Sequence, residues 1–415
     1  MAFVAQFRSF PRASRILMIN QFGINVGFYM LMPYLAGYLA GPLGFAAWVI
    51  GLIMGVRNFS EQGMFVVGGT LADRVGYKAL IVAGCLLRTG GFALLAITQS
   101  FAAVLIASAT IGLTAALFNP AIRAYLAVDV GDRRVEGFAM FNIFYQAGIL
   151  LGPLVGLALV AIDFRIGALC AAALSTVLTA AQLLTLPHRG ADPDTKQTSI
   201  LREWRAVVGN RSFLLFAAVM TGSYILSSQL FLAMPLQASI LTPTFESFFV
   251  ATLFSVSGLV AVAGQLRITT WLVAHWGRGR GLGIGTTILA ASFLPLIIAP
   301  DGQRFGILPA FAALLVSAAL LAVGAAAVFP FEMDTVVTLA GARLVATHYG
   351  FYNTIVGTGV LVGNLATGAL MGAAREACFS ELVWAGLVLV GIVAALALHG
   401  LDRRHHLDAP SVVSR

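Results

Sequence analysis

The chain has 415 residues, of which 59% are hydrophobic and only 10% are charged. Soluble globular proteins carry about a quarter charged residues, so this composition excludes a soluble protein, a disordered chain and a fibrous repeat. The net charge of +8 would suit nucleic-acid binding, but the basic residues form no patch. They lie in short connections between apolar runs, which is typical of a polytopic membrane protein.

Twelve apolar runs follow one another along the chain, and each is long enough to cross a bilayer core as a helix of roughly 20 residues. The first six cover residues 15–40, 46–70, 79–98, 101–126, 137–162 and 165–186. The second six cover residues 211–240, 246–273, 281–299, 305–333, 347–374 and 380–400. The runs are continuously apolar rather than alternating, which favours transmembrane helices over the strands of an outer-membrane barrel.

A polar segment, residues 187–210, separates the two sets of runs. We therefore expect an N-terminal six-helix bundle (1–186), a cytoplasmic linker (187–210) that can end in a short interfacial helix, a C-terminal six-helix bundle (211–400) and a cytoplasmic tail (401–415). Lys and Arg occur mainly in one set of connections, whereas the opposite set contains only Arg165, Arg304 and Arg375. By the positive-inside rule, this distribution predicts that both termini and the linker are cytoplasmic.

The two sets of runs also resemble each other in sequence. The matching residues at a constant offset of 211 are Asn142 and Asn353, Gly148 and Gly359, and Gly152 and Gly363. The first helices of the two sets share a Met-Pro step, at residues 32–33 and 234–235. Such a duplication predicts two parallel six-helix halves with a central cavity, which rock to open it on alternate sides.

The connection after the second run reads GTLADRVGYKALI (69–81). Its glycines permit a tight turn, and its aspartate can accept hydrogen bonds at the N-terminus of a neighbouring helix. The segment resembles the G-x-L-A-D-R-x-G-R-K signature of the major facilitator superfamily, and departs clearly only at Tyr77, where the family usually has a basic residue. The resemblance implies an all-α fold of twelve transmembrane helices in two pseudo-symmetric bundles. It also implies a conformational switch loop formed by Gly69, Asp73, Arg74, Gly76 and Lys78.

In the fifth run, GILLGPLVG (148–156) resembles the G-x-x-x-G-P-x-x-G motif of the drug:proton antiporter branch of that family. Small residues every four positions let helices approach closely, and a proline permits a bend. The motif residues are Gly148, Gly152, Pro153 and Gly156. The corresponding segment of the second half has Asn364 in place of the proline.

Several positions depart from the antiporter pattern. Ser108 stands where many of these antiporters have an arginine in the fourth helix, and the first helix has Asn20, Gln21 and Asn25 where many have an acid. The loop of the second half has Ala274 in place of Asp73. These positions therefore lack the residues that usually relay protons in this branch of the family.

Ionisable groups inside apolar runs are costly, so each is a functional candidate. Arg57 and Glu61 are four residues apart and share a helix face, where they can form a coupling pair or a structural pair. Arg88 and Arg267 are further charges within runs. The candidates for proton coupling or gating are Arg57, Glu61, Arg123, Glu332 and Asp334. Arg123 can pair with either carboxylate of the second half as a gate, or extend separately to the interface.

Polar and aromatic residues of the helices that would line the cavity are substrate candidates. They are Asn25, Tyr29, Phe118, Asn142, Tyr145, Gln146, Tyr224, Gln229, Phe231, Tyr352 and Asn353. A cavity of this composition suits a lipophilic or amphipathic ligand. In the sequence, no pair of basic residues stands out as a clamp for an anion.

These features predict a multi-pass protein of the bacterial inner membrane that exports lipophilic or amphipathic small molecules by alternating access and proton antiport. The alternatives are an uncoupled exporter of one metabolite or a lipid translocator and, in another class, a membrane scaffold or receptor that transports nothing. We expect a monomer whose partners are its substrate, protons and membrane lipid. The chain lacks a Walker-type G-x-x-x-x-G-K-[ST] and other catalytic motifs, so we expect no enzyme activity, ATP use, nucleic-acid binding, cofactor or metal.

Overall fold

The computed structural model describes residues 2–40, 42–45, 47–160, 162–187, 199–241, 246–299, 306–341, 343–376, 381–404 and 406–407. Within these ranges the chain is helical apart from turns and short connections, and no strand occurs. Residues 188–198 of the predicted linker, residues 408–415 of the predicted tail and Arg304 lie outside the described residues.

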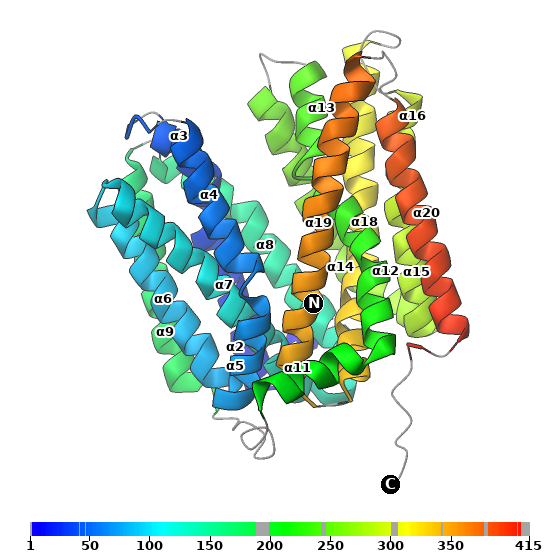
Figure 1. Ribbon diagram of the computed structural model, residues 1–415, viewed down its shortest axis with the longest axis horizontal. Helices are drawn as coiled ribbons and strands as arrows, with labels where there is room; N and C mark the ends of the chain where they lie inside the picture. The colour runs from blue at the N-terminus through cyan, green and yellow to red at the C-terminus, as the bar shows by residue number, and fades with distance from the viewer. Residues whose placement is uncertain are drawn as a thin grey trace. The chain divides into compact units, whose positions relative to one another are not determined.

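Helices cover all six predicted runs of the first half (Figure 1). They follow a short N-terminal helix, α1 (Ala2–Arg8). In chain order they are α2 (Arg12–Tyr29), α3 (Met32–Ala40), α4 (Ala47–Gln62), α5 (Phe65–Val75), α6 (Tyr77–Ile97), α7 (Phe101–Val130), the 3-10 turn η1 (Gly131–Arg133), α8 (Arg134–Val160) and α9 (Phe164–Thr185). The end of the predicted linker forms α11 (Ile200–Gly209).

Helices also cover the six runs of the second half (Figure 1). They are α12 (Arg211–Ser228), α13 (Ala233–Leu241), α14 (Glu246–His275), α15 (Gly277–Ala291), α16 (Leu294–Ile298), α18 (Ile307–Ala340), α19 (Val345–Glu376) and α20 (Glu381–Arg403). The last of these helices extends into the segment that the sequence assigns to the tail.

Three of the runs are broken into two helices just before a proline. The break between α2 and α3 precedes Pro33, the break between α12 and α13 precedes Pro235, and the break between α15 and α16 precedes Pro295. A proline ring clashes with the carbonyl four residues earlier and removes a backbone donor, so a helix tends to end at that point. The Met-Pro step shared by the two halves therefore produces the same break in each.

Nine stretches of the described chain are long and apolar enough to cross a membrane. One of them, Phe101–Leu159, contains both α7 and α8. The pair α4–α5 and the long α19 are not among the nine, so the number of twelve spans stays a prediction. An α-helix pairs most of its backbone groups internally, which suits it to crossing lipid.

Packing divides the chain into two compact units. The first comprises Met1–Asn210 and Ala340–Thr354, and the second comprises Arg211–Leu339 and Ile355–Arg415. The first unit thus includes α11 and the first ten residues of α19, which the sequence places in the linker and in the second half. The helix α19 therefore continues from one unit into the other.

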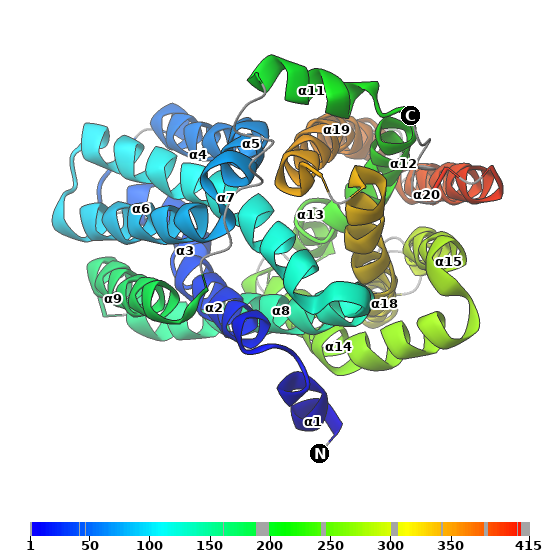
Figure 2. The ribbon, with the colours of Figure 1, turned by 90° about the horizontal axis from the view of Figure 1, so that it is seen from below.

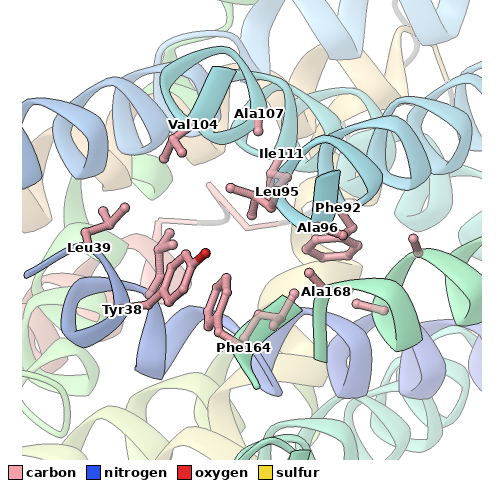
Figure 3. Packing of buried hydrophobic residues seen from close by; sticks show 14 of the residues in the cluster. Tyr38, Leu39, Phe92, Leu95, Ala96, Val104, Ala107, Ile111, Phe164 and Ala168 are labelled. Atoms are coloured by element: carbon pink, nitrogen blue, oxygen red, sulfur yellow. The ribbon is translucent and has the colours of Figure 1, made fainter. Parts of the chain in front are cut away.

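In the first unit, α6 packs against α7 and α9, and α2 packs against α8 and α9 (Figure 2). An apolar cluster fills the space shared by α3, α6, α7 and α9 (Figure 3). The ring of Tyr38 stacks on that of Phe164 with 4.1 Å between the ring centroids. In the second unit, α20 packs against α15 and α12 (Figure 1).

Glycines of α8 allow it to lie directly on α2. A Cβ on Gly148 would lie 2.6 Å from the Asn25 Cβ, and a Cβ on Gly152 would lie 2.6 Å from the Tyr29 Cβ. A Cβ on Gly156 would collide with the carbonyl oxygen of Met30. Helices in lipid gain little from hydrophobic burial against each other, so such close contact is a main source of their association.

The second unit repeats this contact between α19 and α12. A Cβ on Gly359 would collide with Thr221, and a Cβ on Gly363 would lie 2.6 Å from Ile225. These glycines lie 211 residues after Gly148 and Gly152, and their partners both lie 196 residues after the partners of those glycines. The duplication that the sequence indicates therefore extends to a pair of packed helices.

The close contact of α8 with α2 leaves no space for a methyl group at Gly156. We expect Gly156→Ala to lower the apparent melting temperature of the purified protein in detergent, because overpacking a close contact costs about 1–3 kcal/mol. Gly90→Ala is the matched control, since a Cβ at Gly90 in α6 has no atom within 4 Å. Equal melting temperatures for the two variants would contradict the packing argument.

Candidate functional site

The segment 69–78 forms the end of α5, a one-residue turn and the start of α6. Gly76 between the helices has φ 102°, a conformation that L side chains rarely adopt. Gly69 lies against the first turn of α19, where a Cβ would collide with the Ala346 carbonyl oxygen. Both glycines are therefore required by geometry, one for the turn and one for the approach of α19 within the first unit.

The carboxylate of Asp73 binds the N-terminus of α19. It accepts hydrogen bonds from the backbone N–H of Ala346 (3.2 Å), and from the backbone N–H (2.7 Å) and side-chain hydroxyl (2.8 Å) of Thr347. The first N–H groups of a helix have no partner within the helix and carry its positive partial charge. Asp73 thus acts on α19 as a capping residue supplied by another helix.

Tyr77 completes the surroundings of this carboxylate. Its hydroxyl donates a 3.0 Å hydrogen bond to Asp73, although the family signature has a basic residue at this position. Asp73 is only 5% exposed and lies beyond the end of the predicted span. Its pKa is raised above its ordinary value because burial disfavours the charged form, while the hydrogen bonds from Thr347, Ala346 and Tyr77 lower it in part.

The linker helix α11 adds contacts to the same loop. Arg74 binds the carboxylate of Glu203 through two hydrogen bonds of 2.7 and 3.1 Å. The indole of Trp204 donates a 2.7 Å hydrogen bond to the hydroxyl of Thr70 and packs edge-on against Phe351 of α19. Glu203 is nearly buried, at 3% exposure. The loop, the linker helix and the first turn of α19 therefore form one connected site, which we call the latch.

The second cation of the loop, Lys78, donates a 2.9 Å hydrogen bond to the carbonyl of Leu183 at the end of α9. The side chain is largely buried. In the structure, both cations of the loop, Arg74 and Lys78, are thus held by specific acceptors of the protein.

The ionisable residues inside the runs divide between the two units. In the first unit, Arg57 and Glu61 share a helix face as predicted, with 3.8 Å between Nη1 and Oε2, and Arg123 donates a 3.1 Å hydrogen bond to Asn353. In the second unit, Asp334 forms a 2.7 Å ion pair with Arg278. Glu332 accepts a 2.7 Å hydrogen bond from Tyr224. The predicted pairing of Arg123 with either carboxylate would join separate units and stays a prediction.

Comparison with known proteins decides the family. The model of the Major Facilitator Superfamily matches residues 17–301, which include the switch loop and the antiporter motif. The chain belongs to the major facilitator superfamily.

Relatives in this superfamily cover nearly the whole chain. An MFS-type transporter of Mycobacterium tuberculosis (strain H37Rv), itself described as uncharacterized, is 65% identical over 96% of this chain and 95% of its own length. The multidrug resistance protein MdtH of Escherichia coli (strain K12) is 26% identical over 92% of each chain.

Solved structures of low sequence identity share the major facilitator fold. A crystal structure of the human organic anion transporter MFSD10 matches with a TM-score of 0.73 at 15% identity, covering 93% of this chain and 99% of that one. A POT family transporter in complex with 5-aminolevulinic acid matches with a TM-score of 0.71 at 16% identity, covering 95% and 96%. The predicted fold class, an all-α membrane protein of this superfamily, is confirmed.

Several predicted substrate residues form hydrogen bonds or are buried inside the first unit. Asn25 accepts a hydrogen bond from Gln21 (3.0 Å) and donates one to the Tyr145 carbonyl (2.8 Å), and the side chains of Tyr29 and Tyr145 are hydrogen-bonded. Phe118 and Asn142 are buried, and Gln146 is half-buried. Their contact with substrate stays a prediction.

The remaining substrate candidates differ widely in exposure. Gln229 is buried and donates a 3.1 Å hydrogen bond to Asn364, which stands where the first half has Pro153. Tyr352 and Asn353 are buried, whereas Phe231 is 57% exposed. Pro153 itself lies within α8, and its carbonyl accepts a 2.7 Å hydrogen bond from Tyr34.

The sequence motif identifies the switch loop, but it does not identify the residues that the loop contacts. Thr347, Glu203 and Trp204 carry no motif that links them to residues 69–78. A signal was present in the linker, where Glu203 and Trp204 lie in the segment expected to form an interfacial helix. The contacts to α5 and α19 appear only in the folded unit.

The ion pair between Arg74 and Glu203 has a direct test. Arg74→Ala removes the cation that binds the buried carboxylate of Glu203. We expect the free energy of unfolding to fall by about 2–3 kcal/mol, which is less than for a fully buried pair because Arg74 is 22% exposed. The exchanged pair Arg74→Glu with Glu203→Arg should recover most of that loss. The measurement is thermal unfolding in detergent; an unchanged melting temperature in Arg74→Ala, or no recovery in the exchanged pair, would contradict the pairing.

Proposed function

We propose that this protein is a secondary active exporter of lipophilic or amphipathic small molecules that works by alternating access, driven by proton antiport. The observation that carries the proposal is the carboxylate of Asp73, which holds the first turn of α19 through three hydrogen bonds. Because α19 continues into the second unit, releasing its N-terminus is a way to let that unit move. A static membrane scaffold would have no use for such a latch.

The resemblance to MdtH supports export of drug-like molecules, as does the antiporter motif packed on α2. We place the protein in the inner membrane, and the distribution of Lys and Arg supports cytoplasmic termini and a cytoplasmic linker. In this orientation the latch faces the cytoplasm, so its closure would favour the state that is open to the outside.

For the proton we propose Glu61. The other two candidate carboxylates have short partners within the second unit, namely Arg278 for Asp334 and Tyr224 for Glu332. Glu61 lies 3.8 Å from Arg57, and its side chain is 24% exposed, so its contact is looser than those of Asp334 and Glu332. A coupling carboxylate must exchange its proton as its surroundings change.

Uncoupled export remains the second candidate function, because specific residues favour it. Ser108 stands where antiporters of this branch often have an arginine, and the first helix lacks their acid. An exporter of one metabolite or a lipid translocator would need neither residue. The two candidates differ in whether substrate flux moves protons.

Proton coupling is tested with the purified protein in liposomes that enclose a pH-sensitive dye. The vesicles are challenged with lipophilic cations, neutral drugs and amphiphilic acids. We expect substrate-dependent proton movement that is lost in Glu61→Gln and kept in Glu332→Gln. Substrate flux without proton movement would replace antiport by the uncoupled alternative.

The latch is tested by Asp73→Asn in the same liposomes. The amide keeps one acceptor but loses the charge that favours the helix N-terminus, so we expect substrate flux to fall by about tenfold or more, as charge-assisted hydrogen bonds are worth roughly 1.5–3 kcal/mol. Asp132→Asn, at an exposed position in η1, is the matched control. Equal flux in both variants would remove the latch from the mechanism.

A further inference from the structure

In the first unit, three arginines, one partly exposed carboxylate and one tyrosine form a cluster of electrostatically interacting groups. Glu61 of α4 interacts electrostatically with Arg57 of the same helix and with Arg88 of α6. Tyr145 of α8 interacts with Glu61, Arg88 and Arg123 of α7. With the three arginines and Glu61 ionised, the cluster carries a net charge of +2. The sequence did not indicate this cluster, because its members lie on four helices and are separated by up to 88 residues.

Arg88 is the most deeply buried member, with 4% of its surface exposed. Its Nε and Nη1 groups have no hydrogen-bond partner among the described residues. Its guanidinium lies over the ring of Phe118, 6.0 Å from the centroid. A buried charge normally has its donors satisfied, since each unpaired donor carries a desolvation cost. Arg88 therefore retains binding capacity that the protein itself does not use.

Arg57 lies at the accessible side of the cluster. Its side chain is 17% exposed, and Nη1 is 3.8 Å from Glu61, longer than a hydrogen bond. Its Nε has no hydrogen-bond partner in the part of the chain described here. The guanidinium also lies 5.4 Å from the ring centroid of Phe28. A ligand reaching this side would meet a cation with apolar aromatic surface beside it.

We infer that Arg57 and Arg88 bind the acidic group of the cargo, so that this exporter takes amphiphiles bearing a carboxylate in preference to lipophilic cations. The inference rests on the proposed export of amphiphiles and specifies their charge. A guanidinium presents a fork of donors that fits a carboxylate, and the unused donors of both arginines supply it. Phe28, which is partly exposed, offers apolar surface beside Arg57 for the rest of the molecule.

The test uses three aromatic probes of similar shape: naphthaleneacetate, its neutral amide naphthaleneacetamide, and naphthylethylammonium. Their binding to the purified full chain in a non-ionic detergent is measured by calorimetric titration. We expect the acid to bind at least about tenfold more tightly than the ammonium, as a charge-assisted hydrogen bond provides. Weaker binding of the acid than of the ammonium, or no binding of the acid, would overturn the inference.

Variants of the two arginines test whether these residues cause the preference for the acid. Arg88→Gln should weaken binding of the acid by about tenfold and leave the amide unchanged, whereas Arg88→Lys should keep part of the preference. Arg205→Gln, an exposed arginine of α11, is the control and should change neither. If Arg88→Gln does not elute as a single species, Arg57→Gln makes the same comparison. An equal loss for acid and amide would mean that Arg88 supports the fold and not the ligand.

The two proposals fail separately. If the liposomes show export of cations or neutral drugs while the acid binds no better than the ammonium, the proposed export is supported and the preference for acids is contradicted. If the protein binds the acid through Arg88 but transports no compound of the panel, the binding site is supported and the proposed export is contradicted.

Discussion

Contact between α5 and the first turn of α19 depends on glycine at both sides of the crossing. Gly69 admits the carbonyl of Ala346, and a Cβ on Gly350 would lie 2.5 Å from the carbonyl of Phe65. Asp73 lies four residues after Gly69, one helical turn further along the same face, so the approach that the glycines permit brings its carboxylate to the free N–H groups of α19. Larger residues at the crossing would separate the helices by more than a hydrogen bond can span. The electrostatic contact is thus a consequence of backbone packing.

The linker takes part in this arrangement. Its helix α11 belongs to the first unit, where Glu203 binds Arg74 and Trp204 reaches both α5 and α19. The segment that connects the two six-helix sets therefore also contacts the loop that would respond to their movement. Any displacement of the first turn of α19 would have to disturb the indole contact with Phe351 as well as the hydrogen bonds of Asp73. These contacts belong to one compact unit, so they are expected to form and break together.

Much of the fold follows from local features of the sequence, because a bilayer requires long apolar helices and prolines break them at defined places. The switch loop is likewise predicted from its own residues, through their resemblance to the family signature, and the structure gives Gly76 the positive φ of a tight turn. What could not be found are partners from distant helices. Thr347 and Glu203 are ordinary residues until folding brings them to Asp73 and Arg74, and Arg88 looked like an isolated charge. Periodicity and motifs describe one helix at a time, whereas these contacts depend on which faces of several helices meet.

The two units repeat a turn but use it differently. Gly277 has φ 68° and Gly76 has φ 102°, and in each unit the residue that follows the glycine binds a carboxylate. Tyr77 donates to Asp73, whereas Arg278 forms an ion pair with Asp334. A neutral donor leaves Asp73 its charge to act on α19, while the arginine of the second unit neutralises its own acid. Both copies thus keep the glycine turn but differ in charge. The carboxylate of Asp73 can bind a helix N-terminus, whereas that of Asp334 is neutralised by Arg278. This asymmetry is the reason that a single-sided latch can arise from a repeated fold.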